Sequence, residues 1–221
     1  MFDTLMSMPL LSGISRERLA QALSSVKLQF CKYADGESIV SVGDQCDSAT
    51  LLITGLARVS IISEVSHFEL QFTLGAPDAL LPEYIFGRAF SQPAEIKAIG
   101  EVSVLRIAKT DYLSLLQSDP VFVLNMLNIL SLKSQHAFEG VLAISGSSLA
   151  RRIALWVTAL TPLRATDIRL HCASNISEAF GVAPEVMYGV LTQMQADGHI
   201  TSYSDDELTV ADRRSILPLL R

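Results

Sequence analysis

A change in hydrophobic periodicity near residue 108 constrains the fold of this chain more than any other feature. From Lys27 to Ala108, short apolar segments rich in Val, Ile, Leu and Phe are separated by turn signals at intervals of roughly ten residues. These signals are Asp35-Gly36, Gly43-Asp44, Thr54-Gly55, Gly75-Ala76-Pro77 and Gly100. Such spacing is typical of an antiparallel sandwich or barrel, and the clearest predicted strands are Leu56–Ser63 and Val102–Ala108.

Helical patterns flank this predicted β-region on both sides. Before it, Ser15 is a suitable N-cap for a short helix with Leu19 and Leu23 on one face. After it, Thr110 can cap a short helix that ends before Pro120. Pro120 suits the first position of the next helix, because its missing N–H is not needed there.

The helix after Pro120 carries a seam of residues spaced alternately by four and three. Its members are Val123, Leu127, Leu130, Ser134, Ala137, Val141 and Ile144. This spacing predicts a two-helix coiled coil and hence a homodimer, although a single amphipathic core helix would show a similar stripe. The small residues at its middle allow two backbones to approach closely, or leave room for a ligand. Ser145-Gly146-Ser147-Ser148 then predicts a hinge.

The remainder of the chain predicts a winged helix-turn-helix, because helix, glycine-containing turn, helix and β-hairpin follow one another. The segments are helices at Leu149–Leu160, Ile176–Phe180 and Pro184 to about Ala196, and strands at Ile200–Tyr203 and Glu207–Val210. We therefore predict a β-rich domain over 1–119, a dimerisation helix and hinge over 120–146, and a winged helix-turn-helix domain over 147–221.

Composition excludes several classes of protein. With 49% hydrophobic and 18% charged residues the chain is globular. The longest apolar stretch, Val121–Leu132, is too short and too polar to span a bilayer. Asp3 and Pro9 do not suit a signal peptide, so we expect a cytoplasmic protein with no membrane partner. The net charge of −6 argues against coating nucleic acid through bulk charge, but not against a local basic patch.

No motif predicts catalysis or a metal centre. A nucleophile with a paired base, HExxH, a P-loop and GxSxG are all absent from the sequence, so we expect no enzyme. The spacing of Cys31, Cys46 and Cys172 excludes a four-cysteine iron–sulfur or zinc site within one chain, and favours reduced thiols. His67 and His136 could each ligate haem iron, but a lone histidine is more often a surface or core residue, so haem is not expected.

The order of these parts and the residues at their joints resemble the CRP/FNR family of transcription regulators over essentially the whole chain. The matching segments are Pro9–Gly13, Asp35–Ile39, Val42–Asp44, Leu52–Val59, Val104–Ile107, Tyr112–Leu116, Gly181–Ala183, Val190–Leu191 and Gly198–Ile200. The resemblance implies an α+β fold. Its parts are an N-terminal antiparallel β-roll of the jelly-roll type that resembles a cyclic-nucleotide-binding domain and binds the effector (1–119), a long dimerisation helix with a hinge (120–146), and a C-terminal winged helix-turn-helix that binds DNA (147–221). The resemblance also implies a homodimer that reads a palindromic promoter site in double-stranded DNA and responds to a small effector.

The predicted effector pocket departs from the family pattern. Where members that bind cyclic AMP carry Gly-Glu and then Arg-Ser or Arg-Thr, this chain has Pro82-Glu83 and Ala94-Glu95. In the family the glutamate holds the ribose hydroxyl and the arginine neutralises the cyclic phosphate. Without that arginine the phosphate loses its main partner. The added carboxylate would repel the phosphate by about 1–4 kcal/mol at ~4 Å.

We therefore expect an effector of unknown identity rather than cyclic AMP. The residues predicted to form its pocket are Glu83, Arg88, Ala94, Glu95 and Ser134. Arg88 lies in the same loop and could replace the missing arginine, although a single loop arginine is more often simply solvated.

The predicted recognition helix departs from the family pattern too. Typical members begin it with a small hydroxylated residue followed by Arg-Glu, and carry a second arginine further along. Here the corresponding positions are Ala183, Pro184, Glu185 and Gly189. Glu185 can still accept a hydrogen bond from a cytosine amino group, and Tyr188 can reach a base or a phosphate. With Ala183 and the weaker candidate Gln193, they are the predicted DNA-contacting residues.

Positive charge is scarce around this helix. No Lys or Arg occurs from Ser174 to Thr201, so phosphate contacts would have to come from elsewhere in the domain. The candidates are Arg151, Arg152, Arg164, Arg169, Arg213 and Arg214. The alternative is a sensor or protein-interaction module on the same scaffold that does not bind DNA.

Overall fold

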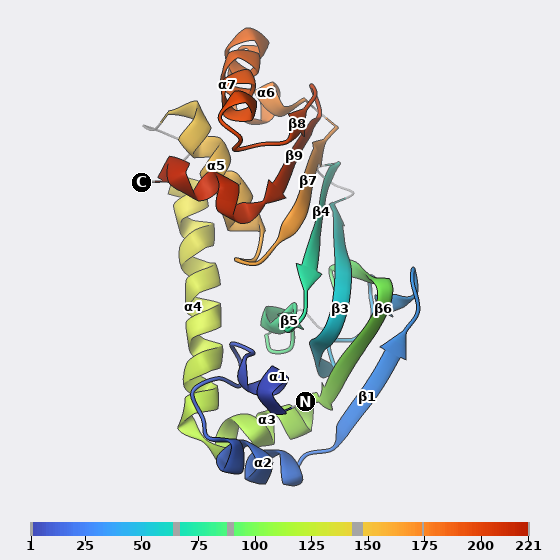
Figure 1. Ribbon diagram of the computed structural model, residues 1–221. Coiled ribbons are helices and arrows are strands. Elements are labelled where there is room, and N and C mark those ends of the chain that lie inside the picture. Colours follow the sequence, from blue (N-terminus) through green and yellow to red (C-terminus); the bar gives the residue numbers. More distant parts are fainter. Residues whose placement is uncertain (1, 64–66, 88–90, 143–147, 174, 221) are drawn as a thin grey trace. The chain divides into compact units, whose positions relative to one another are not determined.

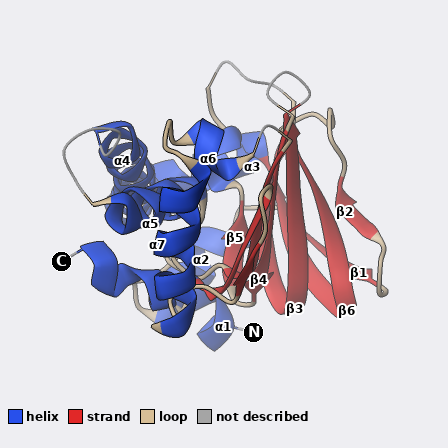
Figure 2. Ribbon diagram, turned by 90° about the horizontal axis from the view of Figure 1, so that it is seen from above, coloured by secondary structure: helices blue, strands red, loops and turns tan. Residues whose placement is uncertain are grey.

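The structure is a computed structural model and describes residues 2–63, 67–87, 91–142, 148–173 and 175–220 (Figure 1). It confirms the predicted α+β class, with an antiparallel set of strands and several helices (Figure 2). The chain divides into two compact units. The first combines the residues up to Arg58 with Gly75–Leu132, and the second combines Val59–Leu74 with the residues from Lys133 onward. The domain boundaries predicted from the sequence stay a prediction.

The first unit contains the β-roll. Its strands are β1 (Leu28–Tyr33), β2 (Ser38–Val40), β5 (Asp78–Leu80), β6 (Ala94–Ala108) and the first part of β3 (Ser48–Ser63). Strand β6 lies between β1 and β3, while β2 also pairs with β6 and β5 pairs with β3. The β1–β6 register runs from Leu28 opposite Ile107 to Tyr33 opposite Val102. Val102, Val104 and Ile107 are buried, as expected for strands with an apolar face on the core.

Two of the predicted turns are wrong. Gly55 lies inside β3 with a φ of +90°, and Gly100 lies inside β6 with a φ of +67°. A Cβ atom on Gly55 would stand 2.5 Å from the backbone oxygen of Glu101. At position 55, glycine is therefore needed because β3 and β6 approach closely, and not because the chain reverses direction. The two predicted strands are confirmed, but each is part of a longer one.

Four α-helices and a 3-10 turn belong wholly or partly to the first unit. They are α1 (Phe2–Met6), α2 (Arg16–Ser24), η1 (Pro82–Tyr84), α3 (Lys109–Ser118) and α4 (Pro120–Leu142). Ser15 caps α2 as predicted, because its side chain accepts a hydrogen bond from the Arg18 N–H. The predicted Thr110 cap is wrong, since α3 already begins at Lys109 and Ala108 occupies its N-cap position. Pro120 opens α4 as predicted.

The core of the first unit joins the helices to the β-roll. Buried residues from α1, α2, α3 and the start of α4 form one cluster with β3 and β6, and Tyr112, Phe122 and Leu105 are among its members. The Asn125 side chain of α4 donates hydrogen bonds to the Leu10 oxygen at 3.3 Å and the Ser12 oxygen at 2.9 Å. The loop between α1 and α2 is thereby held against α4.

The second unit contains the winged helix-turn-helix that the sequence predicted. Its elements are β4 (Phe68–Gly75, apart from its last residue), α5 (Leu149–Leu160), β7 (Thr166–Cys172), α6 (Ile176–Ala179), α7 (Pro184–Ala196), β8 (Ser202–Tyr203), β9 (Glu207–Asp212) and η2 (Arg213–Leu220). The strands lie in the order β4-β7-β9-β8. Strand β7 and its pairing with β4 were not predicted. Of the predicted hinge, residues 145–147 lie outside the described residues, and Ser148 caps α5.

No helix within the described residues is by itself both long and apolar enough to cross a bilayer. The pair Lys109–Ser118 and Pro120–Gly140, bent by 114°, meets the length and composition requirement only when the two are taken together.

Candidate effector pocket and candidate DNA-reading surface

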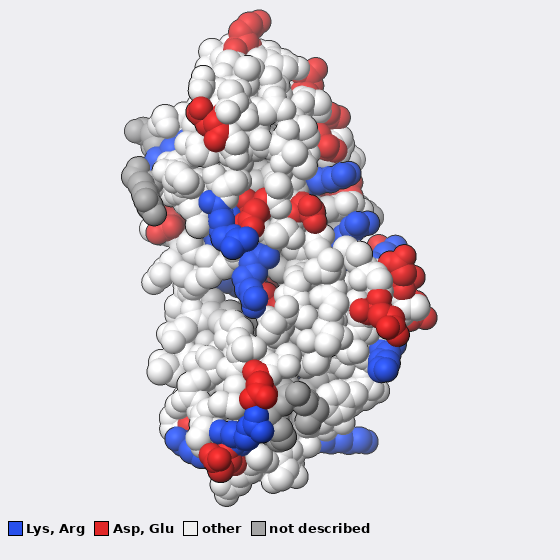
Figure 3. Space-filling model, viewed as in Figure 1, with Lys and Arg blue, Asp and Glu red and all other residues white. Residues whose placement is uncertain are grey.

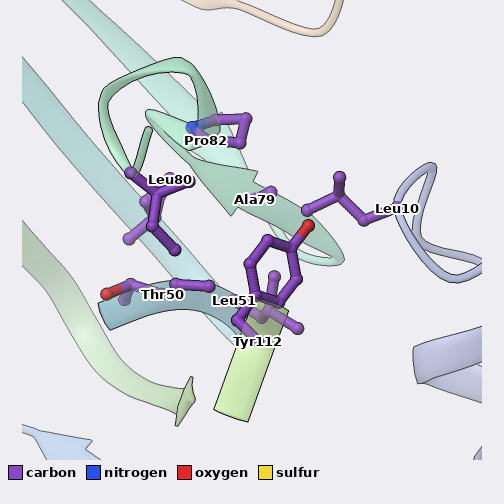
Figure 4. Close-up of a pocket in the computed structure, with 9 residues that line it drawn as sticks. Leu10, Thr50, Leu51, Ala79, Leu80, Pro82 and Tyr112 are labelled. Carbon is purple, nitrogen blue, oxygen red and sulfur yellow. The ribbon is translucent and has the colours of Figure 1, made fainter. Parts of the chain in front are cut away.

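A small cavity lies inside the first unit, between the loop before α2, strands β3 and β5, η1 and α3 (Figure 4). Its lining residues are Leu10, Ala49, Thr50, Leu51, Ala79, Leu80, Pro82, Ile85 and Tyr112. Thr50 and Tyr112 supply the only polar side-chain groups of this lining. The cavity volume of about 10 Å³ suits a single water molecule, whereas pockets for drug-sized ligands measure about 300–1,000 Å³.

The Tyr112 hydroxyl lies in apolar surroundings. It is buried with the rest of its ring, and it donates its hydrogen bond to the Met126 sulfur at 3.9 Å. Burial raises the pKa of Tyr112 far above its ordinary value, because the phenolate would lose its hydration. The hydroxyl therefore stays neutral at any physiological pH.

The predicted effector residues lie elsewhere. Ala94 is completely buried at the start of β6. Glu95 is half-buried and forms an ion pair with Lys97 at 2.9 Å. Glu83 lies half-buried on η1, next to the cavity residue Pro82. None of these three lines the cavity, and a methyl group occupies the position where the family carries its arginine.

Ser134 and Arg88 are the other two residues predicted to form the effector pocket. Ser134 is exposed on α4 and belongs to the second unit. Arg88 lies outside the described residues. The effector site therefore stays a prediction, and the described cavity between β3, β5, η1 and α3 is small and mostly apolar.

Helix α7 is anchored by one face and exposes the other. Met187, Leu191 and Met194 are buried, whereas Glu185 and Val186 are exposed, with Val186 53% accessible. Pro184 occupies the first turn as predicted, and Ala183 is the N-cap without a side-chain hydrogen bond. The sequence places buried residues at helical spacing here, which fixes the exposed face of α7 outward.

The turn before α7 is held by backbone contacts. Gly181 adopts a φ of +63°, and the Val182 N–H donates to the Ser177 oxygen at 3.0 Å. Asn175 caps α6 through its side-chain oxygen, which accepts from the Ser177 N–H at 3.0 Å. These contacts give the short helix–turn–helix geometry that places a second helix against a DNA groove in regulators of this architecture.

Two predicted base-contacting side chains are engaged within the unit. The Tyr188 hydroxyl donates to the Asp205 carboxylate, which raises the pKa of Tyr188, and its ring packs edge-on against Tyr203 at 5.9 Å. Gln193 donates to both carboxylate oxygens of Asp197 at 3.0 Å. Ala183, the N-cap of α7, and Glu185, in its first turn, are both exposed. Of the predicted set, Glu185 is thus the charged residue presented to a partner.

The predicted phosphate contact of Arg213 is wrong. Its side chain is 1% exposed and donates from Nη2 to the Thr158 oxygen at 3.0 Å, near the C-terminal end of α5. Burial lowers its pKa because the charged form is poorly solvated there. The sequence suggested a surface arginine because arginine is rarely buried, but here it interacts with the carbonyl end of a helix.

The other arginines differ in availability. Arg152 donates to the Phe180 oxygen at 2.9 Å and lies over the Phe180 ring at 5.5 Å. Arg214 forms an ion pair with Asp212. Arg151, Arg164 and Arg169 are exposed. The phosphate contacts predicted for these last three positions stay a prediction.

The helix-turn-helix and the wing are acidic. From Leu170 to Asp212 the sequence contains no Lys or Arg. The same segment carries seven carboxylates, namely Glu178, Glu185, Asp197, Asp205, Asp206, Glu207 and Asp212. In Figure 3 the surface over α7 and the β8–β9 tip shows Asp and Glu but no Lys or Arg. This charge disfavours close approach to phosphate unless the arginines outside the segment offset it.

The predicted dimer seam on α4 is exposed where it is described. Val123 is 40% and Leu127 53% accessible, Leu130 is half-buried, and Ser134 and Ala137 are exposed. Val141 is helical, but its side chain, like the whole of Ile144, lies outside the described residues. An apolar helix face left in water favours a partner that covers it. The homodimer stays a prediction that this exposure supports.

Among the described residues, no group of three or more His, Cys, Asp and Glu side chains is placed to hold a metal ion. His67 directly precedes β4. On α4, the His136 Nδ1 atom lies 3.6 Å from the Glu139 Oε2 atom. The three cysteines are free, and burial raises the pKa of both Cys46 and Cys172.

Comparisons with known proteins connect this geometry to a known fold. No protein-family model matches the sequence, and no curated protein matches it either. Among solved structures, the catabolite activator protein of Thermus thermophilus is 18% identical, with a TM-score of 0.52 over 96% of this chain and 98% of that chain. The sensor domain of the transcriptional regulator DNR from Pseudomonas aeruginosa is 19% identical, with a TM-score of 0.51 over 59% of this chain and 86% of that chain. The CRP/FNR-type fold implied by the sequence is thereby confirmed.

Proposed function

We propose that this chain, which has the CRP/FNR-type fold, is a homodimeric transcription regulator whose winged helix reads a palindromic DNA site. One observation carries the proposal: α7 buries Met187, Leu191 and Met194 and presents its opposite face outward, beside a β-hairpin wing. That is the arrangement by which such a helix enters a major groove. The proposal includes a cytoplasmic location and no enzymatic activity.

Glu185 is the residue proposed to read a base. It is exposed on the first turn of α7, where recognition helices contact base edges, and its carboxylate can accept a hydrogen bond from the N4 amino group of cytosine. Tyr188 and Gln193 can join only by giving up their hydrogen bonds to Asp205 and Asp197. Arg151, Arg164 and Arg169 supply phosphate contacts in this proposal, because they are exposed.

The homodimer is proposed to form through α4. A twofold pair of recognition helices reads two half-sites about one DNA turn apart, so the binding site is palindromic. The exposed Val123 and Leu127 provide the apolar contact that such a pairing needs.

The β-roll is proposed to respond to a small effector other than cyclic AMP. The buried Ala94 cannot neutralise a phosphate, and the described cavity is apolar. A ligand that enters it must be small or must displace the side chains that now fill it.

A selection from random double-stranded DNA tests this function. The proposal predicts enrichment of a palindrome by the wild-type chain, with two half-sites separated by about ten base pairs. Glu185→Ala should retain binding but relax the preference at one base pair in each half-site, a discrimination of about 1–3 kcal/mol. Glu178→Ala, which removes a carboxylate from α6 instead, is the matched control and should leave the enriched sequence unchanged. Selection without enrichment would refute DNA reading.

The acidic charge of the helix-turn-helix favours a second candidate function. On this alternative the winged helix binds a protein partner instead of DNA, and the scaffold acts as a sensor or interaction module. The segment from Leu170 to Asp212, which lacks Lys and Arg, is the observation behind it. The same selection separates the two, because the alternative predicts that no sequence is enriched.

A further inference from the structure

Strand β4 forms a continuous strand pair with β7 of the winged helix. The antiparallel register joins Phe68 to Cys172, Glu69 to His171, Leu70 to Leu170, Gln71 to Arg169 and Thr73 to Thr166. The Ala173 N–H extends the pair by donating to the His67 oxygen at 3.1 Å. The hairpin β3–β4 therefore contributes one of the strands of the sheet that also holds the wing.

Side chains of β4 also belong to the interior of this unit. Leu70 and Phe72 are each 2% exposed. The Phe68 ring lies 5.6 Å from Trp156 of α5, and Trp156 lies 5.3 Å from Phe180 beside α6. Removal of β4 would open the ring cluster that joins α5 to the helix-turn-helix.

The same hairpin begins in the first unit. Strand β3 is continuous over Ser48–Ser63, and Ala49, Thr50 and Leu51 at its beginning line the cavity. Thr50 and Leu51 pair with Leu80 and Ala79 of β5, which line the cavity as well. One strand thus carries cavity residues at one end and leads, at the other end, into a strand of the winged helix.

The β4–β7 pair has a defined weak point. Its register shifts between Gln71 and Thr73, so that β7 has one residue more than β4 at this place. Asp167 on the bulged side has a φ of +47°, an uncommon conformation for a residue with a side chain. A bulge leaves a ladder locally unpaired, which makes the pairing easier to open from this end than a regular ladder would be.

We propose that the β3–β4 hairpin transmits changes from the β-roll to the winged helix: movement of β3 at the cavity loosens β4 from β7 and releases the ring cluster around Trp156. The purpose of this device rests on the proposed function, but its existence does not, because it can be measured without DNA. Helix α4 also passes from one unit to the other, so an experiment must separate the two routes.

The antiparallel ladder supplies a built-in control for that experiment. Ala173 donates to β4, so the N–H groups of Arg169 and His171 point the same way by the alternation of the ladder. The Cys172 N–H points the other way and donates to the Asp206 oxygen at 2.8 Å. Loosening of β4 should therefore speed hydrogen exchange at Arg169, His171 and Ala173 but not at Cys172.

Gly55→Ala is the perturbation of β3, because its new Cβ would clash with the Glu101 backbone oxygen. We expect it to speed exchange at the three amides by about tenfold or more and to change the fluorescence of Trp156, the only tryptophan in the chain. Gly75→Ala is the matched control, since its Cβ would meet only the Leu56 side chain at 3.4 Å. Leu51→Ala, at the cavity, perturbs β3 by loss of volume rather than by a clash and should act in the same direction.

A reversible lock tests the route. Phe68→Cys places a thiol opposite Cys172, in a cross-strand pair whose separation suits a disulfide. In the Gly55→Ala and Leu51→Ala backgrounds, the oxidised form should regain slow exchange at Arg169 and Ala173, and reduction should restore fast exchange. Phe68→Ala controls for the lost ring. Unchanged exchange in both β3 variants, or equally fast exchange in the oxidised and reduced forms, would overturn the proposal.

Discussion

The β-roll and the winged helix both lack arginines that the family resemblance implies. The two regions differ in the side chains found at those positions. In the β-roll the buried methyl group of Ala94 takes the position of the family's arginine, and the described cavity beside β3 and β5 measures about 10 Å³. On α7 nothing replaces the missing cations, and carboxylates such as Glu185 remain exposed. In the first region a buried apolar side chain fills the position, whereas in the second the acidic surface favours partners other than those of a basic surface.

This difference has a physical origin. A buried cation without a counter-ion is costly, so a closed site that loses its ligand is stabilised by apolar side chains. A surface cation costs little, so its loss alters long-range electrostatics without affecting the fold. Substitutions in the first region should therefore affect stability, and substitutions in the second should affect binding alone.

The largest effect is expected at a third surface, the apolar seam of α4. The double substitution Leu127→Asp and Leu130→Asp should convert the homodimer into a monomer of 24.0 kDa, because each aspartate would bury an unpaired charge in the seam. Light scattering at micromolar concentration measures the change. Asn128→Asp, an exposed residue of the same helix, should leave the dimer intact. A wild-type chain that is already monomeric would contradict the dimer.

A smaller but substantial effect is expected at Ala94. Because this side chain is completely buried, Ala94→Arg should destabilise the first unit by about 3 kcal/mol or more through overpacking and an unpaired charge. The thermal midpoint should fall by roughly 6–12 °C. Glu95→Arg introduces the same group one residue later at a half-exposed position and should be tolerated.

Calorimetry with cyclic AMP tests the same region from the side of the ligand. Wild-type protein should show no binding at physiological nucleotide concentrations. Tight binding by the wild-type chain would show that the missing arginine is not required, and would undo the comparison.

Much of this architecture was predictable because its signals are local. The N-cap at Ser15, the start of α4 at Pro120 and the anchored face of α7 each follow from a few neighbouring residues. The errors came from features that depend on distant partners. Gly55 was interpreted as a turn because the close approach of β6 cannot be seen in the sequence around it. Strand β7 was missed because its partner β4 lies about a hundred residues earlier in the chain.

The candidate sites show the same limit. The sequence could identify the missing family arginines, since that needs only the residue at a matching position. It could not show that Tyr188 donates to Asp205, or that Arg213 is buried, because both depend on how the hairpin and η2 pack on the helices. Which polar side chains pair with one another depends on the tertiary structure.

A moderate effect is expected at Arg213, where two guanidinium nitrogens, Nε and Nη1, have no hydrogen-bond partner among the described residues. Arg213→Met keeps the packing of the stem and removes the charge, so stability should be unchanged or higher by about 1–2 kcal/mol. Arg213→Ala leaves a cavity and should be destabilising. Chemical denaturation measures both, with the exposed Arg214→Met as control. A large loss in the methionine variant would mean that the charge itself is required.

The smallest effect is expected from acid. The hydrogen bond from Arg214 holds the pKa of Asp212 below its ordinary value, so the folded state favours the carboxylate. Its contribution is present above the ordinary pKa of an aspartate and disappears as the pH falls through the lowered value. Because Arg214 is 78% exposed and water screens the pair, Asp212→Asn should shift the thermal midpoint at pH 7 by only about 1 °C. The difference from wild type should shrink as the pH falls below the ordinary pKa of an aspartate.

The salt dependence of binding to the DNA site enriched by selection distinguishes a DNA-reading winged helix from one that binds a protein. Titration of the wild-type dimer at several salt concentrations gives the slope of log K against log salt, and each neutralised phosphate adds about 0.9 to its magnitude. With few exposed arginines and an acidic helix-turn-helix, the account predicts a slope magnitude of about 4–6 and an unchanged slope for Glu185→Ala. No measurable binding even at low salt would contradict DNA reading and favour a protein partner for the winged helix.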